Sequence, residues 1–323
     1  MQKKAKRVPL QKNFLSRKSG ISLKGAIVAC SHSNHCYTLF LGDKVVKAVL
    51  AGRLKNLIFE KKNPITVGQV VLVDIEKSPN RIEQLVEPKN SLERYVAERR
   101  FVIASNIDNV VITTSCKAPL PKLALIDRFL CFCAIKAITP IVCINKIDLQ
   151  KDFSALKKKF SFYIEYGIKC LFVSAKTGEN IEKLKENLIG KTSIFTGQSG
   201  VGKSSILNAI QPNLALKVGE ISSFNKKGKH ITSASSMFKL DCGGFLMDTA
   251  GIKTFALSTE KLWDLPKVFP SFAAYRCKFN DCCHINQLGC LVEKAVKTGI
   301  IPEERYLSYK RLFTDLQRSR VYY

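Results

Sequence analysis

The sequence has no apolar run long enough to span a lipid bilayer. Its best candidate, residues 123–138, is interrupted by Asp127, Arg128 and Lys136, so we expect a packed helix there and no membrane partner. The first 24 residues contain eight Lys or Arg and no Asp or Glu, and they lack the long apolar centre of a secretory signal. We therefore expect residues 1–20 to be a basic arm that touches nucleic-acid phosphates, with an organellar transit peptide as the alternative.

Acidic residues are scarce, because 26 Asp and Glu stand against 52 Lys and Arg and leave a net charge of +26. Such an excess indicates nucleic acid as the first partner and an anionic membrane surface as the second. An apolar share of 46% can form the cores of two or three globular domains. The 12 cysteines are spread along the chain, which favours a reducing, cytoplasmic location over a secreted disulfide scaffold.

Residues 21–90 read as short strands separated by turns. Five segments rich in apolar residues lie at 22–30, 36–42, 44–54, 69–77 and 81–87. Five short strands in so short a segment predict a small closed all-β barrel of the OB type, a fold that often binds oligonucleotides. The polar residues 88–100 have the composition of a connector.

From Ile107 onwards, buried strand patterns alternate with helical patterns. The expected strands are 107–115, 140–145, 169–174 and 193–196, the expected helices are 123–138, 154–166, 179–188 and 203–210, and paired strands are expected at 235–240 and 244–247. This alternation predicts a parallel, doubly wound α/β sheet within a domain at 91–254. The remaining residues, 255–323, are expected to be helical at both ends around a cluster of Cys and His.

The stretch GQSGVGKS at 197–204 follows an apolar strand pattern and opens a helical one. That is the context of a P-loop, in which backbone N–H groups and the helix N-terminus surround phosphates. Lys203 would reach the β- and γ-phosphates, and Ser204 would bind Mg²⁺. The predicted nucleotide contacts here are Gly197, Gln198, Ser199, Gly200, Val201, Gly202, Lys203, Ser204 and Ser205.

Two further segments complete the predicted phosphate side. Asp248 and Gly251 form a D-x-x-G motif after an apolar strand, where Asp248 would hold Mg²⁺ through water and the Gly251 amide would sense the γ-phosphate. The basic segment 211–235 lies where a switch loop should be. Thr232 is the candidate there for contact with Mg²⁺ and the γ-phosphate.

The stretch NKID at 145–148 ends another apolar strand and indicates guanine. Asp148 can accept hydrogen bonds from the ring N–H and the exocyclic amine of guanine, a donor pattern that adenine lacks. Lys146 would pack over the base, and Asn145 would tie this loop to the P-loop. The match predicts a GTP site and not an ATP site.

A second guanine-side stretch, SAK at 174–176, also follows a strand. The Ala175 amide is expected to contact the guanine oxygen, and Ser174, Ala175 and Lys176 are all predicted to line the site. Both guanine stretches precede the P-loop in the chain. Because ligands bind at the carboxyl ends of strands whatever order the chain visits them, this order indicates a circularly permuted domain in which residues 188–193 join the two halves.

A cluster at 277–290 offers Cys277, either Cys282 or Cys283, His284 and Cys290 as metal ligands. Three thiolates and one imidazole match a closed, structural Zn²⁺ site. The alternative is a loose group of cytosolic thiols. The basic side chains expected around it, which would grip RNA phosphates, are Lys294, Lys297, Lys310 and Arg311.

A second cluster, at 30–36, is interpreted as the polar tip of a hairpin. Its Cys30, His32, His35 and Cys36 lie within seven residues, which can hardly wrap one ion with four ligands. Cys131 and Cys133 lie two apart on a helix, so they do not face the same way, and we interpret them as core residues.

With guanine motifs ahead of the P-loop and switches, the sequence resembles the circularly permuted GTPases, and most closely the small ribosomal subunit biogenesis GTPase family (RsgA). Further matches are AGRLK at 51–55, VGQ at 67–69, LALIDRFL at 123–130, GKHITSA at 228–234, PEERYLSY at 302–309 and the terminal cysteine cluster. The resemblance selects Cys282 over Cys283. It implies GTP hydrolysis coupled to late maturation of the 30S subunit and stimulated by that particle.

The chain departs from the family pattern at three places. It has Thr249 and Ala250 inside the D-x-x-G motif where the family usually has Ser and Pro, Ile231 where Thr is usual, and Gln69 where Asp is usual. The Asp and Gly of the motif are kept, so the assignment stands.

Hydrolysis requires a positioned water. The residue after the D-x-x-G motif is Ile252, which cannot orient water. His230 is the nearest polar replacement, and the resemblance also favours it, although it can instead contact RNA. We therefore predict His230, Lys203 and Thr232 as catalytic residues.

The sequence thus predicts a multidomain GTPase: an OB-type barrel at 21–90, a circularly permuted α/β P-loop GTPase domain at 91–254 and an α-helical zinc-binding domain at 255–323. The expected partners are GTP and GDP, the 30S subunit and its 16S rRNA, and the protein is expected to be a monomer. Two alternatives stay open: an RNA-binding module with a vestigial GTP site, and a P-loop ATPase or kinase.

Overall fold

The computed structural model describes residues 13–15, 22–32, 35–54, 65–96, 99–212, 236–248, 264–272 and 274–321. These fall into two compact units. The barrel unit contains the described residues up to Ile107 together with strands β13 (Ser236–Lys239) and β14 (Phe245–Asp248). The α/β unit contains the described residues of 108–212, the turn at 240–244 and the C-terminal segment from 264 onwards.

The barrel unit is built on a closed sheet of five strands. They are β2 (Ser22–Ser31), β3 (Cys36–Leu41), β4 (Lys44–Leu50), β5 (Val70–Asp74) and β6 (Asn80–Leu85). The order is β2-β3-β4-β6-β5, and β5 pairs with β2 to close the sheet; only β4 and β6 run parallel. The prediction of a small closed barrel is confirmed.

Alternation of apolar residues explains this barrel. Ala26 and Val28 of β2, and Val71 and Val73 of β5, are two residues apart and fully buried, so each pair points to the same interior. The short strand β1 (Asn13–Leu15) pairs with β2, and β13 meets β2 where Ser236 lies opposite Cys30.

The polar stretch 88–100 is not a simple connector, so that interpretation is wrong. Strand β7 (Ser91–Val96) pairs antiparallel with β8 (Arg99–Ser105). Leu92 and Ala104 lie opposite each other in this hairpin and are both fully buried. This apolar pair anchors the hairpin, and the many charged residues around Leu92 hid that pattern in the sequence.

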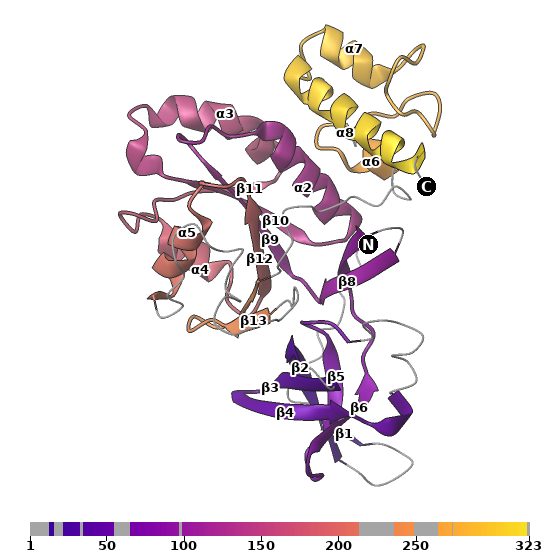
Figure 1. The fold of residues 1–323 in the computed structure, drawn as a ribbon. Helices are drawn as coiled ribbons and strands as arrows, with labels where there is room; N and C mark the ends of the chain where they lie inside the picture. Colours follow the sequence, from indigo (N-terminus) through magenta and orange to yellow (C-terminus); the bar gives the residue numbers. More distant parts are fainter. Residues whose placement is uncertain are drawn as a thin grey trace. The chain divides into compact units, whose positions relative to one another are not determined.

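The α/β unit contains a parallel sheet in the order β11-β10-β9-β12 (Figure 1). The strands are β9 (Asn109–Ser115), β10 (Thr139–Asn145), β11 (Lys169–Phe172) and β12 (Thr192–Gly197). Every residue of β9 is buried, as expected for a central parallel strand. The predicted parallel α/β sheet is therefore present.

Helices flank this sheet on both faces. Helices α2 (Leu123–Ile135) and α3 (Phe153–Glu165) lie on one side, and α4 (Ile181–Glu186) and α5 (Lys203–Ile210) lie on the other (Figure 1). A short 3₁₀ turn, η2 (Ile147–Leu149), follows β10. The C-terminal segment adds α6 (Leu265–Val268), α7 (Leu291–Lys297) and α8 (Glu303–Val321). No helix among the described residues has the length and apolarity needed to cross a membrane.

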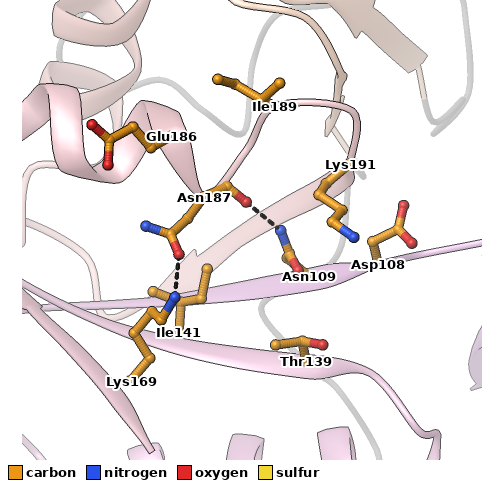
Figure 2. A pocket seen from close by; sticks show the side chains of 9 residues that line it. All are labelled: Asp108, Asn109, Thr139, Ile141, Lys169, Glu186, Asn187, Ile189 and Lys191. Carbon is orange, nitrogen blue, oxygen red and sulfur yellow. Dashed lines mark hydrogen bonds between the residues drawn. The ribbon is translucent and has the colours of Figure 1, made fainter.

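The join between the two halves of the sheet lies at its amino-terminal edge. Thr192 exchanges two backbone-side hydrogen bonds with Asp108, since its N–H donates to Oδ2 (2.8 Å) and its carbonyl accepts from the Asp108 N–H (2.8 Å). The Asn109 amide donates to the carbonyl of Asn187 at 3.0 Å, and Lys169 donates to the Asn187 side chain (Figure 2). These contacts hold the joining segment in place.

A polar cavity of about 330 Å³ lies beside this join. Figure 2 shows its lining: Asp108, Asn109, Thr139, Ile141, Lys169, Glu186, Asn187, Ile189 and Lys191. Several of these residues begin strands, so the cavity is at the opposite end of the sheet from the loops that carry the predicted nucleotide motifs. In sheets of this type the ligand binds at the carboxyl ends of the strands.

Candidate nucleotide and metal sites

The predicted guanine and phosphate residues lie at the carboxyl ends of three strands of the same parallel sheet, in which β9 separates β10 from β12. NKID begins at the last residue of β10, SAK follows β11, and the P-loop begins at the last residue of β12. The chain visits these strands in the order β10, β11, β12, which puts the guanine loops before the phosphate loop.

Asn145 connects all three loops. Its side chain is buried, with only 1% exposure. Its Nδ2 donates to the Val201 carbonyl at 2.9 Å, and its Oδ1 accepts from the Ala175 N–H at 3.0 Å. One amide group therefore fixes the guanine loops to the phosphate loop.

The Ser174 side chain orients the carboxylate of Asp148. The Ser174 hydroxyl donates to Asp148 Oδ1 at 2.6 Å and accepts from the Thr177 N–H at 3.2 Å. Ser174 is fully buried, whereas Asp148 is exposed at the mouth of the loop. Lys176 is also exposed.

Lys146 also links the loops, and it does so through a segment that sequence reasoning missed. Its Nζ donates to the carbonyls of Ala118 (2.5 Å) and Gly200 (2.7 Å). The Cys116 thiol donates to the Lys146 carbonyl at 2.8 Å. The loop after β9 is therefore a wall of the site. Its position after a strand of the same parallel sheet was the signal that could have identified it.

The P-loop has the close backbone approaches that require glycine. A Cβ on Gly197 would lie 1.9 Å from the Thr113 carbonyl oxygen, and one on Gly202 would lie 2.4 Å from Asn145 Nδ2. Both glycines also have positive φ, at 134° and 94°. Only glycine satisfies the space and the backbone conformation together.

The ammonium group of Lys203 in the P-loop is hydrogen-bonded to backbone carbonyls. Lys203 Nζ donates to the carbonyls of Gly197 (2.9 Å) and Gln198 (2.7 Å). Ser204 is buried in the first turn of α5. The N-terminal amides of α5 and the Lys203 ammonium thus lie where a phosphate would be bound.

The structure describes the remaining predicted phosphate-binding residues only in part. Asp248 is the last residue of β14, and its side chain lies outside the described part of the chain. His230, Thr232 and Gly251 lie wholly outside the described residues. Their roles stay predictions.

Four of the predicted metal ligands form one cluster. The ligand atoms of Cys277, Cys282, His284 and Cys290 lie within 4.8 Å of one another. Nδ1 of His284 is 3.5, 3.3 and 3.5 Å from the sulfurs of Cys277, Cys282 and Cys290, and the sulfurs of Cys277 and Cys290 are 4.0 Å apart. Tetrahedral Zn²⁺ would place sulfur about 3.8 Å from sulfur and about 3.6 Å from nitrogen. The donor set and its spacing fit Zn²⁺.

The surrounding structure supports this geometry. Burial, together with the neighbouring thiols of Cys277 and Cys290, raises the pKa of Cys282 to about 12. Burial lowers the pKa of His284 and so favours the neutral imidazole that a metal requires. Crowded thiols that ionise with difficulty alone become good ligands when a cation neutralises them. Cys283 is not one of the four clustered residues, and its carbonyl accepts a hydrogen bond from the Tyr309 hydroxyl at 2.6 Å.

The second Cys/His stretch does not form a comparable cluster. Among the described residues, the group around His284 is the one with three or more close Cys, His, Asp or Glu ligands. His32 Nε2 shares a hydrogen bond with Thr38 Oγ1 at 2.7 Å, and the Cys30 thiol donates to a backbone carbonyl. Cys131 and Cys133 are fully buried in α2, as expected for core residues.

Comparisons with known proteins agree with this arrangement. A profile of the RsgA GTPase family matches residues 85–258, which is more than half of the chain. A protein of Bacteroides fragilis named small ribosomal subunit biogenesis GTPase RsgA is 30% identical over 309 residues, covering 92% of this chain and 98% of that protein. The chain belongs to the RsgA GTPase family. It is accordingly a GTPase.

Other known proteins are similar to this chain over different lengths. The Haemophilus influenzae protein of the same name is 40% identical over 224 residues; this alignment covers 68% of the present chain and 64% of that protein. The crystal structure of YjeQ from Thermotoga maritima superposes with a TM-score of 0.73 at 31% identity, covering 91% of this chain and 99% of the other. YloQ, titled a circularly permuted GTPase, superposes with a TM-score of 0.70 at 24% identity over 98% of this chain and supports the fold.

The RsgA GTPase profile ends before the cysteine cluster. The candidate metal site therefore rests on the geometry of its own residues, whereas the nucleotide loops rest on both geometry and family.

Proposed function

We propose that this RsgA-family GTPase couples GTP hydrolysis to late maturation of the small, 30S ribosomal subunit in the cytoplasm. The observation that carries the proposal is the bonding of Asn145 to both Val201 and Ala175. It makes guanine recognition and phosphate binding one connected site. The relatives named small ribosomal subunit biogenesis GTPase supply the process.

Guanine specificity would come from the loops around Asp148. The carboxylate, oriented by the Ser174 hydroxyl at 2.6 Å, would accept from the two guanine donors. The aliphatic stem of Lys146 would cover the base while its ammonium stays on the Ala118 and Gly200 carbonyls. An adenine would leave Asp148 without its partners, a loss worth a factor of about 10⁴ or more in similar cases.

Phosphoryl transfer would depend on positioning and charge. The P-loop amides would bind the β-phosphate, and Lys203 would move from the Gly197 and Gln198 carbonyls to the phosphates. The hydroxyls of Ser204 and Thr232, with Asp248, are the oxygen donors that fit Mg²⁺. Mg²⁺, when bound, neutralises charge on the phosphate oxygens. His230 would orient the attacking water, since Ile252 cannot.

The other parts of the chain would bind the particle. The net charge of +26 supports contact with 16S rRNA by the basic arm at 1–20, the barrel at 21–90 and the zinc-bearing segment at 255–323. Zn²⁺ would have a structural role, because four protein ligands leave no open position. The chain that leaves the D-x-x-G motif continues directly into this segment, so the nucleotide state can be relayed to the RNA-binding surface.

The deciding experiment measures GTP turnover by the full-length protein alone, with purified 30S subunits and with 50S subunits. We expect slow basal turnover and stimulation by 30S alone. Affinity for 30S should be higher with a non-hydrolysable GTP analogue than with GDP. Equal affinity in the two nucleotide states would exclude the coupling.

The alternative is an RNA-binding module with a vestigial GTP site. It predicts particle binding without nucleotide turnover. Stimulated turnover that is lost in Ser204→Ala and His230→Ala, with particle binding retained, would exclude this alternative.

A further inference from the structure

Two stretches noted in the sequence, LALIDRFL at 123–130 and PEERYLSY at 302–309, supply no predicted nucleotide contact and no metal ligand. They meet in the structure. Helix α2, which contains the first, packs against α8, which contains the second. Arg305 of α8 forms a salt bridge with Asp127 of α2, although the residues are 178 positions apart.

This ion pair is enclosed within the protein. The exposed fractions of Arg305 and Asp127 are 3% and 0%. Asp127 also accepts hydrogen bonds from Ser308 Oγ (2.7 Å) and Tyr163 OH (3.0 Å), and Arg305 Nη1 donates to Tyr163 OH at 2.6 Å. Burial raises the pKa of the Asp127 carboxyl, and the Arg305 guanidinium and Ser308 hydroxyl oppose the rise.

Aromatic rings close the space around the guanidinium. Its central carbon lies 4.6 Å from the ring centres of both Phe162 and Tyr163 in α3, and 5.8 Å from that of Phe269 after α6. Arg305 is therefore gripped by α2 through a carboxylate and by α3 through stacked rings. A Lys could not supply both the planar fork and the stacking.

Both helices that hold Arg305 begin at the guanine loops. Helix α2 follows the loop whose Ala118 carbonyl accepts from Lys146, and α3 follows NKID and η2. The neighbouring residues of α8 hold the metal cluster instead. Tyr306 OH donates to the His284 carbonyl at 2.8 Å, and Tyr309 OH donates to the Cys283 carbonyl at 2.6 Å.

Helix α8 thus uses two faces, about 100° apart, to form hydrogen bonds with two different parts of the protein. Arg305 and Ser308, spaced i and i+3, bond to the nucleotide-binding side. Tyr306 and Tyr309, with the same spacing, bond to the loop of the metal ligands. One helix sets the distance between the two sites.

We propose that Arg305 and Asp127 form a positioning lock that couples the zinc-bearing segment to the guanine loops through α2 and α3. A buried ion pair is a poor way to gain stability, since apolar residues of similar volume are often equal or better. The pair instead fixes one position of α8 relative to α2 and α3, because the guanidinium fork fits the carboxylate and the Tyr163 hydroxyl in one arrangement. Particle contact at the zinc-bearing segment would be transmitted to the nucleotide by this route, in addition to the covalent chain. This last statement rests on the proposed function.

The test distinguishes an effect on the position of α8 from an effect on the stability of the fold. Arg305→Met leaves a buried carboxylate unpaired, so its melting temperature should fall by about 5–10 °C. The double variant Asp127→Leu/Arg305→Met removes both charges and should melt within about 3 °C of the parent. At saturating 30S, its GTP turnover should still be about tenfold below that of the parent, with basal turnover and zinc content unchanged. Recovery of stimulation together with stability would overturn the proposal.

Two controls accompany it. Gln317→Met places the same new side chain at an exposed position of the same helix and should keep the saturated turnover. Arg305→Lys keeps the charge and should lose stimulation, because Lys lacks the planar fork. Stimulation retained in Arg305→Lys would show that charge alone suffices and would reject the lock.

A second measurement needs no ribosomal particle, so it can fail independently of the proposed function. The rate of GDP release is followed with a fluorescent analogue before and after zinc is removed by a chelator. Zinc removal should change the rate several-fold in the parent and leave it unchanged in Asp127→Leu/Arg305→Met. An equal response of the two proteins, or none in the parent, would contradict the coupling.

Discussion

At the scale of single residues, the candidate nucleotide and metal sites depend on a few side chains whose hydrogen bonds or close contacts the structure describes. Asn145 holds three loops together, Ser174 orients Asp148, and His284 brings three thiols together. Each of these side chains has one geometry that satisfies its hydrogen bonds or ligand contacts. Conservative substitutions should therefore separate the roles cleanly.

Asp148→Asn should change base preference. The amide of Asn donates where the carboxylate accepted, so it opposes the guanine amine and suits the oxygen of xanthine. We expect kcat/KM for GTP to fall at least about hundredfold while that for xanthosine triphosphate rises. Steady-state turnover with GTP, xanthosine triphosphate and ATP measures this; an unchanged preference, or equal use of ATP by the parent, would support the ATPase alternative.

Cys282→Ser should remove the metal, whereas Cys283→Ser should not. The sulfur of Cys282 is 3.3 Å from His284 Nδ1, whereas Cys283 is not one of the four clustered residues. We expect one zinc per chain by atomic absorption in the parent and in Cys283→Ser, and less than about a tenth of that in Cys282→Ser. Equal zinc content in the two variants would refute the assigned ligand set.

At the scale of elements, loops and turns are held by specific approaches of the backbone. The turn at 240–244, between β13 and β14, docks on the joining segment of the α/β unit. A Cβ on Gly244 would lie 2.4 Å from the Leu188 carbonyl oxygen and 2.8 Å from that of Lys191. No side chain fits there without movement of the backbone.

Gly244→Ala and Gly243→Ala form a matched pair. Both glycines have positive φ, at 100° and 86°, so both substitutions carry a similar conformational cost. The nearest atom to a Cβ on Gly243 is the Ile189 Cγ2 at 3.9 Å, an ordinary contact. Urea unfolding should show Gly244→Ala to be less stable than Gly243→Ala by about 2 kcal/mol. Equal stabilities would mean that the turn does not dock as described.

The barrel contains a chain of ion pairs that predicts acid sensitivity. Lys77 Nζ lies 3.0 Å from Asp74 and 3.2 Å from Glu83, which also pairs with Arg53. The hydrogen bond from Lys77 lowers the pKa of Asp74. Since this pKa is lowered in the folded state, its stabilising effect is complete above the ordinary value of about 4 and is lost as the pH falls through the lowered value.

Asp74→Asn should therefore lower the melting temperature at pH 5–7, and the difference from the parent should shrink below about pH 4. Glu76→Gln, at an exposed carboxylate two residues away, is the control and should follow the parent. Melting curves across this pH range decide; a pH-independent difference would show that Asp74 acts by packing alone.

At the scale of the whole molecule, the main feature is the large net positive charge. A net charge of +26 on 323 residues is far more than a nucleotide site requires. If basic surfaces bind rRNA phosphates, association releases counterions. Affinity for 30S particles should then fall steeply with salt, by about 10³-fold or more between 50 and 200 mM. Affinity for GTP should change much less, and equal salt dependence of the two would argue against extensive phosphate contact.

How much the sequence predicted follows from how local each feature is. The predicted guanine and phosphate loops are contiguous stretches with strict residue requirements, so the sequence alone could propose them. The closed barrel and the parallel sheet followed from alternation and apolar runs. The hairpin at 91–105 was missed because the buried apolar pair that marks it, Leu92 and Ala104, lies among charged neighbours.

The sequence by itself determined which loops are predicted to bind a guanine nucleotide and in what order they occur, because motif identity and motif order are both properties of the linear chain. The tertiary structure decided which distant residues meet. The wall made by Ala118 at Lys146 and the buried pair of Asp127 with Arg305 join segments that share no local pattern. Such contacts depend on how helices pack on the sheet, and packing is settled only when the whole core forms.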